Sequence, residues 1–342
     1  MIFPKLDFNK KSCKDANINK GLLVDMFNRI ENEKFNIHSM VLLHEGSVVF
    51  DAYAYGFNQN TKSNVYSVSK SFTSVAIGIL IDMELINLEN IVLFYFTEDV
   101  DSYLKEYEQL KIKHLLTMTV GQEKDLFHDL TPKDNPFEIF FNQPLVSEPG
   151  KTFLYSNFAS FILSAIVTKV TGKSLNDFLN EYLYREINME KPSWDSINDY
   201  TFGCSGLNIS LHDMARFGHL ILNDGKWQDK QIVSKEYLDD ATAKHIPEPG
   251  TPIFYGYHFW VHNYVMAAGL YKQYIIIDKR NNLVFAMQAY EERDVLGLYN
   301  NYIVRAIEEG WEYCDYSLRD FTRKFYLNSK PLIEKENEER YG

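Results

Sequence analysis

Cysteine is scarce in this chain of 342 residues, which contains Cys13, Cys204 and Cys314 and no others. Because their number is odd and their separations are long, they form neither a disulfide framework nor the ligand spacing of a zinc site. This usage of cysteine favours a reducing compartment.

Positive charge is also in short supply. The chain has 47 acidic residues against 35 basic ones, which gives a formal net charge of −12, and no basic stretch is interleaved with aromatic residues. Nucleic-acid binding depends on Lys and Arg side chains that neutralise phosphates. We therefore expect no nucleic-acid partner.

Long apolar runs are missing. The best one, residues 75–81, ends at Asp82, far short of the roughly 20 residues that span a bilayer. The first residues, Met1 to Asp7, lack the apolar segment of a signal peptide. The sequence therefore predicts a cytoplasmic protein without a membrane span.

Several catalytic and cofactor-binding templates are absent. The chain has no G-x-S-x-G, H-E-x-x-H, P-loop or G-x-G-x-x-G motif. Its nine histidines do not cluster at metal-ligand spacing, so we expect neither a metal nor a cofactor. Repeats, low-complexity tracts and Pro/Gly/Ser-rich linkers are also lacking, and two domains would therefore be interleaved rather than joined in series.

What the sequence does contain is material for a large core, with 45% hydrophobic and 15% aromatic residues and a length that suggests about two domains. Its periodicity indicates strands near both ends and helices between them. Helical patterns cover residues 19–35, 67–85, 112–118, 158–170, 175–183, 211–222 and 294–311. Strand patterns cover residues 37–44, 47–55, 254–260, 264–268, 274–278 and 283–289.

We predict a mixed α/β (α+β) fold in which the strands from both ends form one antiparallel sheet flanked by helices. Residues 1–66 and 241–342 would build the sheet domain, and residues 67–240 an inserted all-helical domain. A cleft between the two would hold an active site. Residues 315–342 form a C-terminal extension, which we predict to be a solvated tail or a weak terminal helix.

The first candidate site is Ser67-Val68-Ser69-Lys70, at the start of a strongly apolar helical pattern. Ser67 would lie in the first turn, with Lys70 one turn further on the same face. A serine becomes nucleophilic when a neighbouring base takes its proton, and burial together with the helix dipole favours a neutral Lys70. The backbone N–H of Ser67 is a natural oxyanion donor there.

The S-x-x-K spacing alone is not specific. Ser102-x-x-Lys105 is a second instance, in a charged segment typical of a solvated surface. For Ser67 the alternative is a serine that merely caps its helix.

The second candidate is Tyr155-Ser156-Asn157, which follows a Pro-Gly pair and precedes a helical pattern. Tyr155 can donate or relay a proton, and Asn157 can orient an amide or ester. The same pattern occurs at Tyr299 and Tyr326. The alternative is a buried tyrosine followed by a helix-capping asparagine.

The third candidate is Ala267-Ala268-Gly269-Leu270, in a β-rich run. Small side chains and Gly269 would let a substrate approach the backbone of an edge strand closely. The alternative is a set of small residues in a packed sheet.

In this order and at these separations, the three motifs resemble those of the serine β-lactamase and penicillin-binding-protein superfamily. The likeness is to its class C-like branch of esterases, amidases and D-amino-acid peptidases. Ser67 and Tyr155 are 88 residues apart, and Tyr155 and Gly269 are 114 apart, which is similar to that branch.

The resemblance covers roughly residues 37–310. Further stretches typical of the branch are His114 to Thr119, Pro149-Gly150, Gly203 to Leu207, and Asp213 to Gly218.

The resemblance implies a β-lactamase/transpeptidase-like fold and roles for individual residues. Ser67 would form the acyl-enzyme, Lys70 would be its base or proton relay, and Tyr155 would be the second acid-base residue. Whether Lys70 or a Tyr155 phenolate takes the serine proton stays open, because the two would titrate as a unit. The implied substrate contacts are Asn157, Ala268, Gly269 and Leu270, and the implied oxyanion hole is the N–H groups of Ser67 and Leu270.

The chain departs from the family at the third motif. β-Lactamases and D,D-peptidases typically have Lys-Thr-Gly where this chain has Ala267-Ala268-Gly269. The missing cation normally helps to hold the substrate carboxylate, whose burial without a partner is costly. The departure favours an ester or amide without that carboxylate over a penicillin, unless Lys272 supplies the charge.

The sequence thus predicts a serine hydrolase that cleaves a small ester or amide through an acyl-enzyme on Ser67. One alternative is a non-catalytic ligand-binding or penicillin-sensor-like module on the same fold, which the missing cation suggests. A further alternative is a β-lactamase or D,D-peptidase. The expected partner is a small-molecule substrate, and the oligomeric state is not predicted.

Overall fold

The computed structural model of the chain describes residues 8–341. Met1 to Asp7, on which the prediction of no signal peptide rests, lie outside the described residues. The chain divides into two compact units. We name them the sheet unit (Met1–Ser63, Ile209–Asn223 and Ala268–Gly342) and the helical unit (Asn64–Asn208 and Asp224–Ala267). This grouping differs from the predicted domains in residues 64–66, 209–223 and 241–267, and the predicted boundaries stay a prediction.

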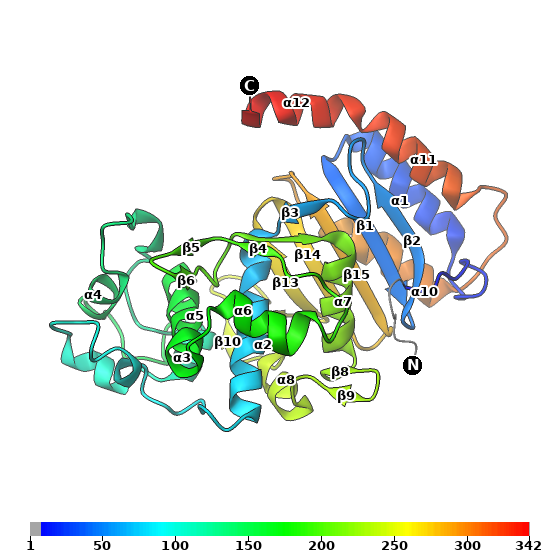
Figure 1. Cartoon of the computed structure of the whole chain (residues 1–342). Coiled ribbons are helices and arrows are strands. Elements are labelled where there is room, and N and C mark those ends of the chain that lie inside the picture. Colours follow the sequence, from blue (N-terminus) through cyan, green and yellow to red (C-terminus); the bar gives the residue numbers. More distant parts are fainter. Residues whose placement is uncertain (1–7, 342) are drawn as a thin grey trace. The chain divides into compact units, whose positions relative to one another are not determined.

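The sheet unit consists of strands from both ends of the chain and the helices that cover them (Figure 1). Its strands are β1 (Ile37–His44), β2 (Ser47–Tyr53), β14 (Gln273–Asp278) and β15 (Leu283–Ala289). Its helices are α1 (Lys20–Glu33), α7 (Leu211–Leu222), α9 (Leu296–Leu298), the π-helical turn Tyr299–Ile303, α10 (Val304–Glu309), α11 (Leu318–Asn328) and α12 (Lys330–Tyr341).

Strands from the two ends of the sequence pair directly, as predicted. They follow the antiparallel order β14-β15-β1-β2, in which Met40 of β1 lies between Ala52 of β2 and Met287 of β15. Glu45 and Gly46 join β1 to β2 with φ angles of 50° and 72°. Two left-handed residues give a hairpin turn whose twist matches that of the flanking strands.

Helices cover both faces of these strands. Gly218 of α7 packs against Val284, while the next residue of β15, Phe285, stacks on Tyr299 of the π-helical turn. Because successive side chains of a strand point to opposite faces, α7 and the turn lie on opposite sides of the sheet. β14 and β15 are consequently buried along their whole lengths.

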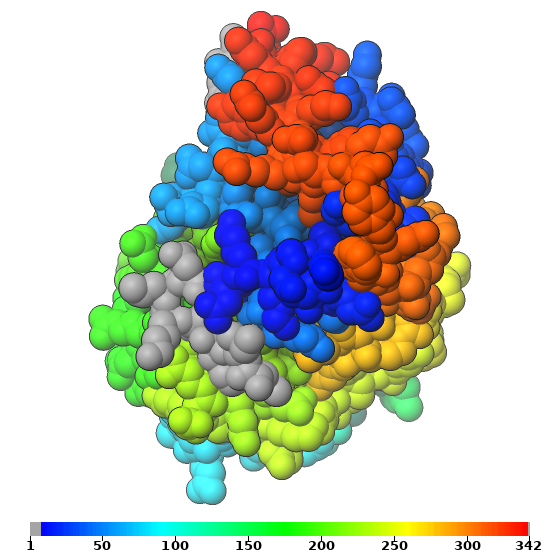
Figure 2. Space-filling model, turned by 90° about the vertical axis from the view of Figure 1, so that its right-hand side faces the viewer, coloured from blue at the N-terminus to red at the C-terminus, as the bar shows by residue number. Residues whose placement is uncertain are grey.

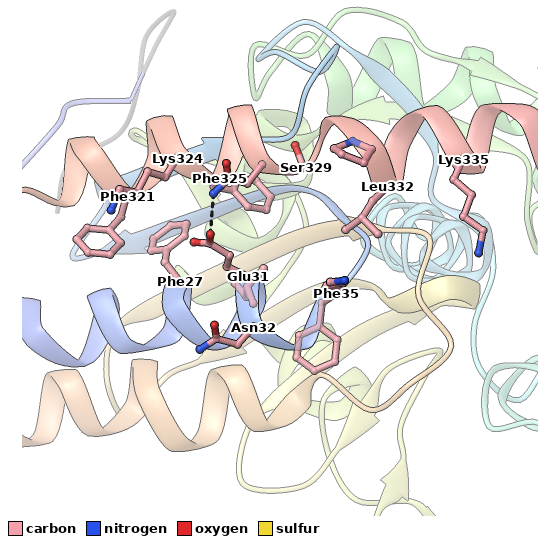
Figure 3. Close-up of a pocket in the computed structure, with 14 residues that line it drawn as sticks. Phe27, Glu31, Asn32, Phe35, Phe321, Lys324, Phe325, Ser329, Leu332 and Lys335 are labelled. Atoms are coloured by element: carbon pink, nitrogen blue, oxygen red, sulfur yellow. Dashed lines mark hydrogen bonds between the residues drawn. The ribbon is translucent and has the colours of Figure 1, made fainter.

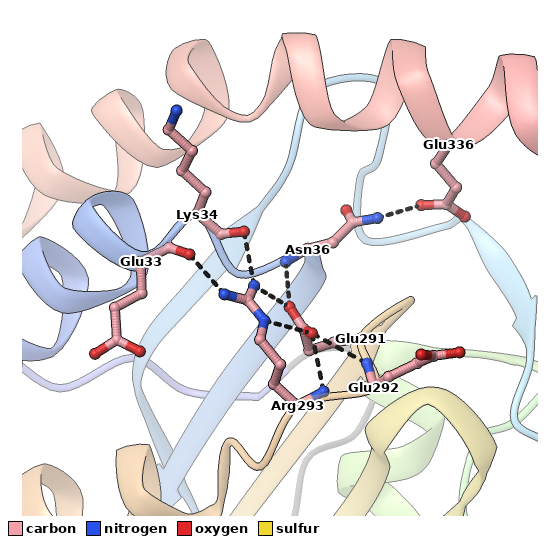
Figure 4. Close-up of polar contacts among 7 residues, drawn as sticks. All are labelled: Glu33, Lys34, Asn36, Glu291, Glu292, Arg293 and Glu336. Carbon is pink, nitrogen blue, oxygen red and sulfur yellow. Dashed lines mark hydrogen bonds and ion pairs between the residues drawn. The ribbon is translucent and has the colours of Figure 1, made fainter.

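An arginine clamp closes the end of α1. Arg293 donates to the carbonyl oxygens of Glu33 (2.8 Å) and Lys34 (3.0 Å), and its guanidinium also pairs with Glu291 (2.6 Å; Figure 4). Glu291 in turn accepts a hydrogen bond from the backbone N–H of Asn36 (3.1 Å). The clamp satisfies carbonyl groups that every helix leaves unpaired at its C-terminus.

The C-terminal extension is helical and packs on the sheet unit, so of the two forms predicted for it the terminal helix is the one found. Glu336 of α12 is buried and forms an ion pair with buried His38 (2.6 Å). Ser329 accepts a hydrogen bond from the backbone N–H of Tyr55 (2.8 Å). Figure 2 shows this segment, orange to red, against N-terminal residues in blue.

The helical unit is built around α2 and α5, which contact each other and are buried along most of their lengths. Its helices are α2 (Ser69–Asp82), α3 (Ile112–Leu116), α4 (Pro136–Phe141), α5 (Asn157–Thr171), α6 (Leu175–Leu179), which continues as the π-helical turn Asn180–Tyr184, and α8 (Lys235–Ala241). Its short strands are β4 (Ser193–Trp194), β5 (Ser196–Ile197), β6 (Tyr200–Thr201), β8 (Lys226–Trp227), β9 (Lys230–Gln231), β10 (Ile246–Pro247), β11 (Phe254–Tyr255) and β12 (Trp260–Val261). Residues of both units occur in β3 (Lys62–Asn64), β7 (Leu207–Ser210) and β13 (Val265–Gly269).

The predicted strand over residues 254–260 is wrong in its middle. β11 and β12 are its two ends, and between them the backbone N–H of Gly256 donates to the carbonyl of Phe259 (2.8 Å), which closes a turn. The helix predicted over residues 294–311 is also interrupted, by the π-helical turn.

Across residues 8–341, a single helix long and apolar enough to cross a membrane is not found. One pair, Asn157–Thr171 with Leu175–Tyr184, reaches that length and composition when its two arms, bent by 72°, are taken together.

We predict that Gly218→Ala destabilises the protein. A Cβ at Gly218 would lie 2.6 Å from Val284 and 2.7 Å from Ile275. Alanine favours a helix by about 1 kcal/mol over glycine, but overpacking a core costs about 1–3 kcal/mol. Urea unfolding should show a net loss, whereas Gly297→Ala, whose Cβ would have no neighbour closer than 3.4 Å, should be nearly neutral. Equal stability of the two variants would contradict this packing.

Candidate active site

Ser67 lies in a short 3-10 turn, Tyr66–Val68, directly before α2. Tyr66 has a φ of 47°, a left-handed conformation that bulky residues rarely adopt. The turn is held by Asn64, whose side-chain oxygen accepts from the N–H of Tyr66 (2.8 Å). The N-cap of α2 is Val68, without a side-chain capping bond, so Ser67 does not serve as the helix cap.

Lys70 is buried, with 1% of its surface exposed. Its Nζ lies 3.1 Å from Ser67 Oγ, 2.7 Å from Asn157 Oδ1 and 2.9 Å from the carbonyl oxygen of Cys204. The last two are oxygens that can only accept. Because they bind two of the hydrogens on Nζ, they direct its third position, a hydrogen or a lone pair, toward Ser67. A distance of 3.1 Å is within the range of proton transfer.

Asn157 is the first residue of α5, and its side chain connects Lys70 to an acidic residue. The N-cap is Ser156, which accepts from the N–H of Ala159 (3.1 Å), so the predicted alternative of a capping Asn157 is wrong. Asn157 Nδ2 donates to Asp125 (2.9 Å) and to Nε2 of His128 (3.0 Å). Since a carboxylate can only accept, Asp125 fixes the orientation of the amide, with Nδ2 toward Asp125 and Oδ1 toward Lys70.

Asp125 was not found from the sequence. Its carboxylate also accepts from the backbone N–H groups of Asn157 (2.9 Å) and Phe158 (3.1 Å) and from Ser156 Oγ (3.2 Å). It therefore satisfies free N–H groups of α5 and places a negative charge at the positive end of that helix. No local pattern could reveal this, because Asp125 lies 32 residues before Asn157 in an irregular loop.

The Cys204 carbonyl is positioned by the loop around Gly203. Gly203 has a φ of 67°, and a Cβ there would lie 2.8 Å from Ser164 Cβ. Thr73 Oγ1 donates to the Gly203 carbonyl (2.7 Å) and ties the loop to α2. Burial raises the pKa of the Cys204 thiol to about 11, so the sulfur stays protonated at neutral pH while the backbone oxygen binds Lys70.

Tyr155 is partly exposed beside Lys70, whose Nζ lies 4.8 Å from the centre of its ring. The ring stacks on Trp260 of β12 (5.8 Å between centres, 11° between planes) and meets Tyr255 of β11 at its edge (6.1 Å). Within the described chain the Tyr155 hydroxyl has no hydrogen-bond partner, so it is available to a bound molecule.

His258 contacts the backbone of Lys70 and the side chain of Ser160. Its Nδ1 lies 3.2 Å from the carbonyl oxygen of Lys70, and its Nε2 lies 3.4 Å from Ser160 Oγ on α5. Complete burial, and secondarily the charge of Lys70, lowers the pKa of His258 to about 3. The imidazole is therefore neutral, and because a carbonyl can only accept, Nδ1 carries the proton.

The third motif lies mostly in the sheet unit, because Ala267 is the last residue of the helical unit and Ala268 to Leu270 belong to the sheet unit. Ala268 and Gly269 end β13, and Leu270, which is exposed, begins a turn in which Tyr271 and Lys272 have φ angles of 56° and 66°. The helical unit thus brings together Ser67, Lys70, Tyr155 and Asn157. The predicted substrate contacts of Ala268, Gly269 and Leu270, and the oxyanion hole shared by Ser67 and Leu270, stay predictions.

The second S-x-x-K sequence has no comparable geometry. Ser102 is exposed, its Oγ contacts Asn142 Oδ1 (3.4 Å), and it shares no hydrogen bond with Lys105 in the described structure. Groups of three or more His, Cys, Asp or Glu side chains suited to a metal ion do not occur among residues 8–341.

Comparison with known proteins agrees with this fold. The chain belongs to the beta-lactamase family, whose model matches residues 33–305. It therefore has the fold of the serine β-lactamase and penicillin-binding-protein superfamily, as the motifs predicted.

Among its relatives, the 6-aminohexanoate-dimer hydrolase of Paenarthrobacter ureafaciens is 24% identical over 225 residues, which are 60% of this chain and 57% of that protein. Penicillin-binding protein 4* of Bacillus subtilis is 25% identical over 199 residues, 50% of this chain and 42% of that protein. The matched regions thus span about half of these relatives.

Solved structures match over more of the chain. A putative 6-aminohexanoate-dimer hydrolase from Bacillus anthracis has a TM-score of 0.72 at 22% identity and covers 89% of this chain and 87% of its own. EstCE1, a hydrolase with promiscuous acyltransferase activity, has a TM-score of 0.67 at 15% identity and covers 84% of this chain and 98% of its own.

We predict that His258 makes the folded protein less stable as the pH falls below about 6.5. Its pKa is about 3 in the folded protein but about 6.5 in an unfolded chain, so the unfolded state binds more protons between these values. Its contribution is complete above pH 6.5 and is lost as pH falls toward 3, by up to about 1.4 kcal/mol per pH unit.

Urea unfolding at pH 7, 6 and 5 measures this dependence. His258→Asn should be less stable at pH 7 but should lose less stability on acidification than the wild type. The partly exposed His262 provides the control, and His262→Asn should keep the wild-type slope. An unchanged slope in His258→Asn would show that His258 is not the group responsible.

Proposed function

We propose that this protein is a serine hydrolase that cleaves a small ester or amide through an acyl-enzyme on Ser67. The observation that carries the proposal is the placement of Lys70 Nζ, 3.1 Å from Ser67 Oγ and held by two oxygens that can only accept. Such a serine-base pair, with the base oriented by further groups, is the arrangement that activates a nucleophile.

The proposed reaction has two halves. Lys70 takes the proton of Ser67, either directly or in concert with Tyr155, while Oγ attacks the acyl carbon. The bond to the leaving alcohol or amine breaks, and the leaving group receives a proton from Lys70 or from the free hydroxyl of Tyr155. Water then attacks the acyl-enzyme and releases the acid, with the same groups managing the proton in reverse.

The surroundings of Tyr155 favour a substrate with an uncharged, apolar part. Phe153, Tyr255 and Trp260 form an aromatic cluster beside it, with ring centres 4.7–6.2 Å apart. Aromatic rings offer a large apolar surface at low entropic cost. The Ala267-Ala268-Gly269 sequence, which lacks the usual lysine, points the same way. The relatives that are named as hydrolases, among them the 6-aminohexanoate-dimer hydrolase and EstCE1, support hydrolysis as the class of reaction.

We predict that Ser67→Ala abolishes turnover of activated esters such as p-nitrophenyl acetate and butyrate. Lys70→Ala and Tyr155→Phe should each lose about 10²–10⁴-fold in kcat/KM, the usual worth of a positioned acid-base group. Stopped-flow kinetics of the wild type should show a burst of p-nitrophenol if deacylation is slow.

Ser102→Ala is the matched control, because it removes the other S-x-x-K serine and should leave the rate unchanged. Full activity in Ser67→Ala would overturn the proposal. If folded wild-type protein turned over no ester, amide or penicillin, the alternative of a non-catalytic binding module would replace the hydrolase proposal.

A further inference from the structure

The sheet unit contains a cavity whose lining includes none of the residues of the candidate active site. It has a volume of about 630 Å³ and lies between α1 and the C-terminal helices α11 and α12 (Figure 3). This size is typical of small-molecule sites. Its apolar lining is contributed by Phe27, Ile30, Phe35, Phe321, Phe325 and Leu332.

The walls of this cavity are held in place by specific contacts. Asn328 donates to Glu31 across it (2.7 Å), and the rings of Phe27 and Phe325 meet edge to face at 6.1 Å. Phe35 packs against Arg293, whose guanidinium lies 4.6 Å from the centre of the Phe35 ring. The cavity is therefore a built feature of the packed extension rather than a gap beside a loose tail.

The charges that line the cavity are mostly positive. Lys34, Lys324 and Lys335 belong to the lining, and Glu31 is its one carboxylate, already engaged by Asn328. Lys335 forms an ion pair with Glu339 (3.4 Å), whereas Lys34 and Lys324 have no carboxylate partner in the described structure. The Nζ of Lys324 lies 5.0 Å from the centre of the Phe321 ring. In a chain of net charge −12, three lysines against one carboxylate around an apolar cavity make it complementary to an anion.

We propose that this cavity binds a single-chain alkyl carboxylate, a fatty acid of medium length. The alkyl chain lies against the phenylalanine rings and Leu332. The carboxylate lies beside Lys324, at the opposite end of the cavity from Lys335 (Figure 3), which is already paired with Glu339. No arginine lines the cavity, and the paired donors of arginine are what phosphate recognition commonly uses. The lining therefore suits a compact carboxylate better than a phosphate headgroup.

Isothermal titration calorimetry with dodecanoate, below its micellar concentration, tests the proposal. We expect one site per chain and an affinity that rises about three- to fourfold per methylene from octanoate to dodecanoate. Dodecanol, which has the same chain but no charge, should bind at least tenfold more weakly. Ser67→Ala protein should give the same result, so the outcome is independent of the proposed hydrolase activity.

Variants locate the site. Lys324→Met combined with Lys34→Met should weaken dodecanoate binding at least fivefold without affecting dodecanol, and Phe325→Ala should weaken both. Lys330→Met is the control, because Lys330 begins the neighbouring helix α12, is exposed and is not part of the lining. The thermal midpoint of each variant shows that it is folded.

Three results would overturn the proposal. They are equal affinity for dodecanol and dodecanoate, no binding to the folded wild type, and binding that none of the lining variants changes. Sedimentation velocity adds a fourth, because a dimer that forms with concentration and is lost in Phe325→Ala would show that a second copy of the chain fills the cavity.

Discussion

The buried amino group of Lys70 is the constraint on which the rest of the candidate site depends. Burial of a lysine head group costs several kcal/mol unless hydrogen-bond partners replace water. Ser67, Asn157 and the Cys204 carbonyl supply three partners, and each is held by a further contact of its own. Asn64 holds the turn that carries Ser67, Asp125 holds Asn157, and the contacts of Gly203 hold the Cys204 loop. Orientation of the amine toward Ser67 is thus a consequence of satisfying its buried hydrogens.

The same reasoning explains why the site needs so few charged groups. An amide and a backbone carbonyl orient Lys70 without neutralising its charge. The Asp125 carboxylate binds the Asn157 side chain and the backbone N–H groups at the start of α5. A neutral His258 packs under Lys70 and adds no charge. Preorganised neutral dipoles of this kind need little rearrangement when charge moves during a reaction.

Much of the fold follows from local patterns in the sequence. The strands at both ends, the helix over residues 211–222 with its Ser210–Asp213 capping box, and the hairpin at Glu45-Gly46 were predictable because periodicity and turn chemistry act over a few residues. Ser67, Lys70 and Asn157 were found from their motifs. Asp125, the Cys204 carbonyl and the packing of Glu336 on His38 were not, because each is a contact between segments far apart in the chain.

The central claim is that Ser67 is an activated nucleophile, and covalent labelling tests it most directly. Folded wild-type protein and Ser67→Ala are treated with a fluorophosphonate, and intact-mass spectrometry with peptide mapping locates any adduct. We predict one adduct per chain on Ser67 in the wild type and none in the variant. Unlabelled wild type, or labelling that persists in Ser67→Ala, would contradict the account.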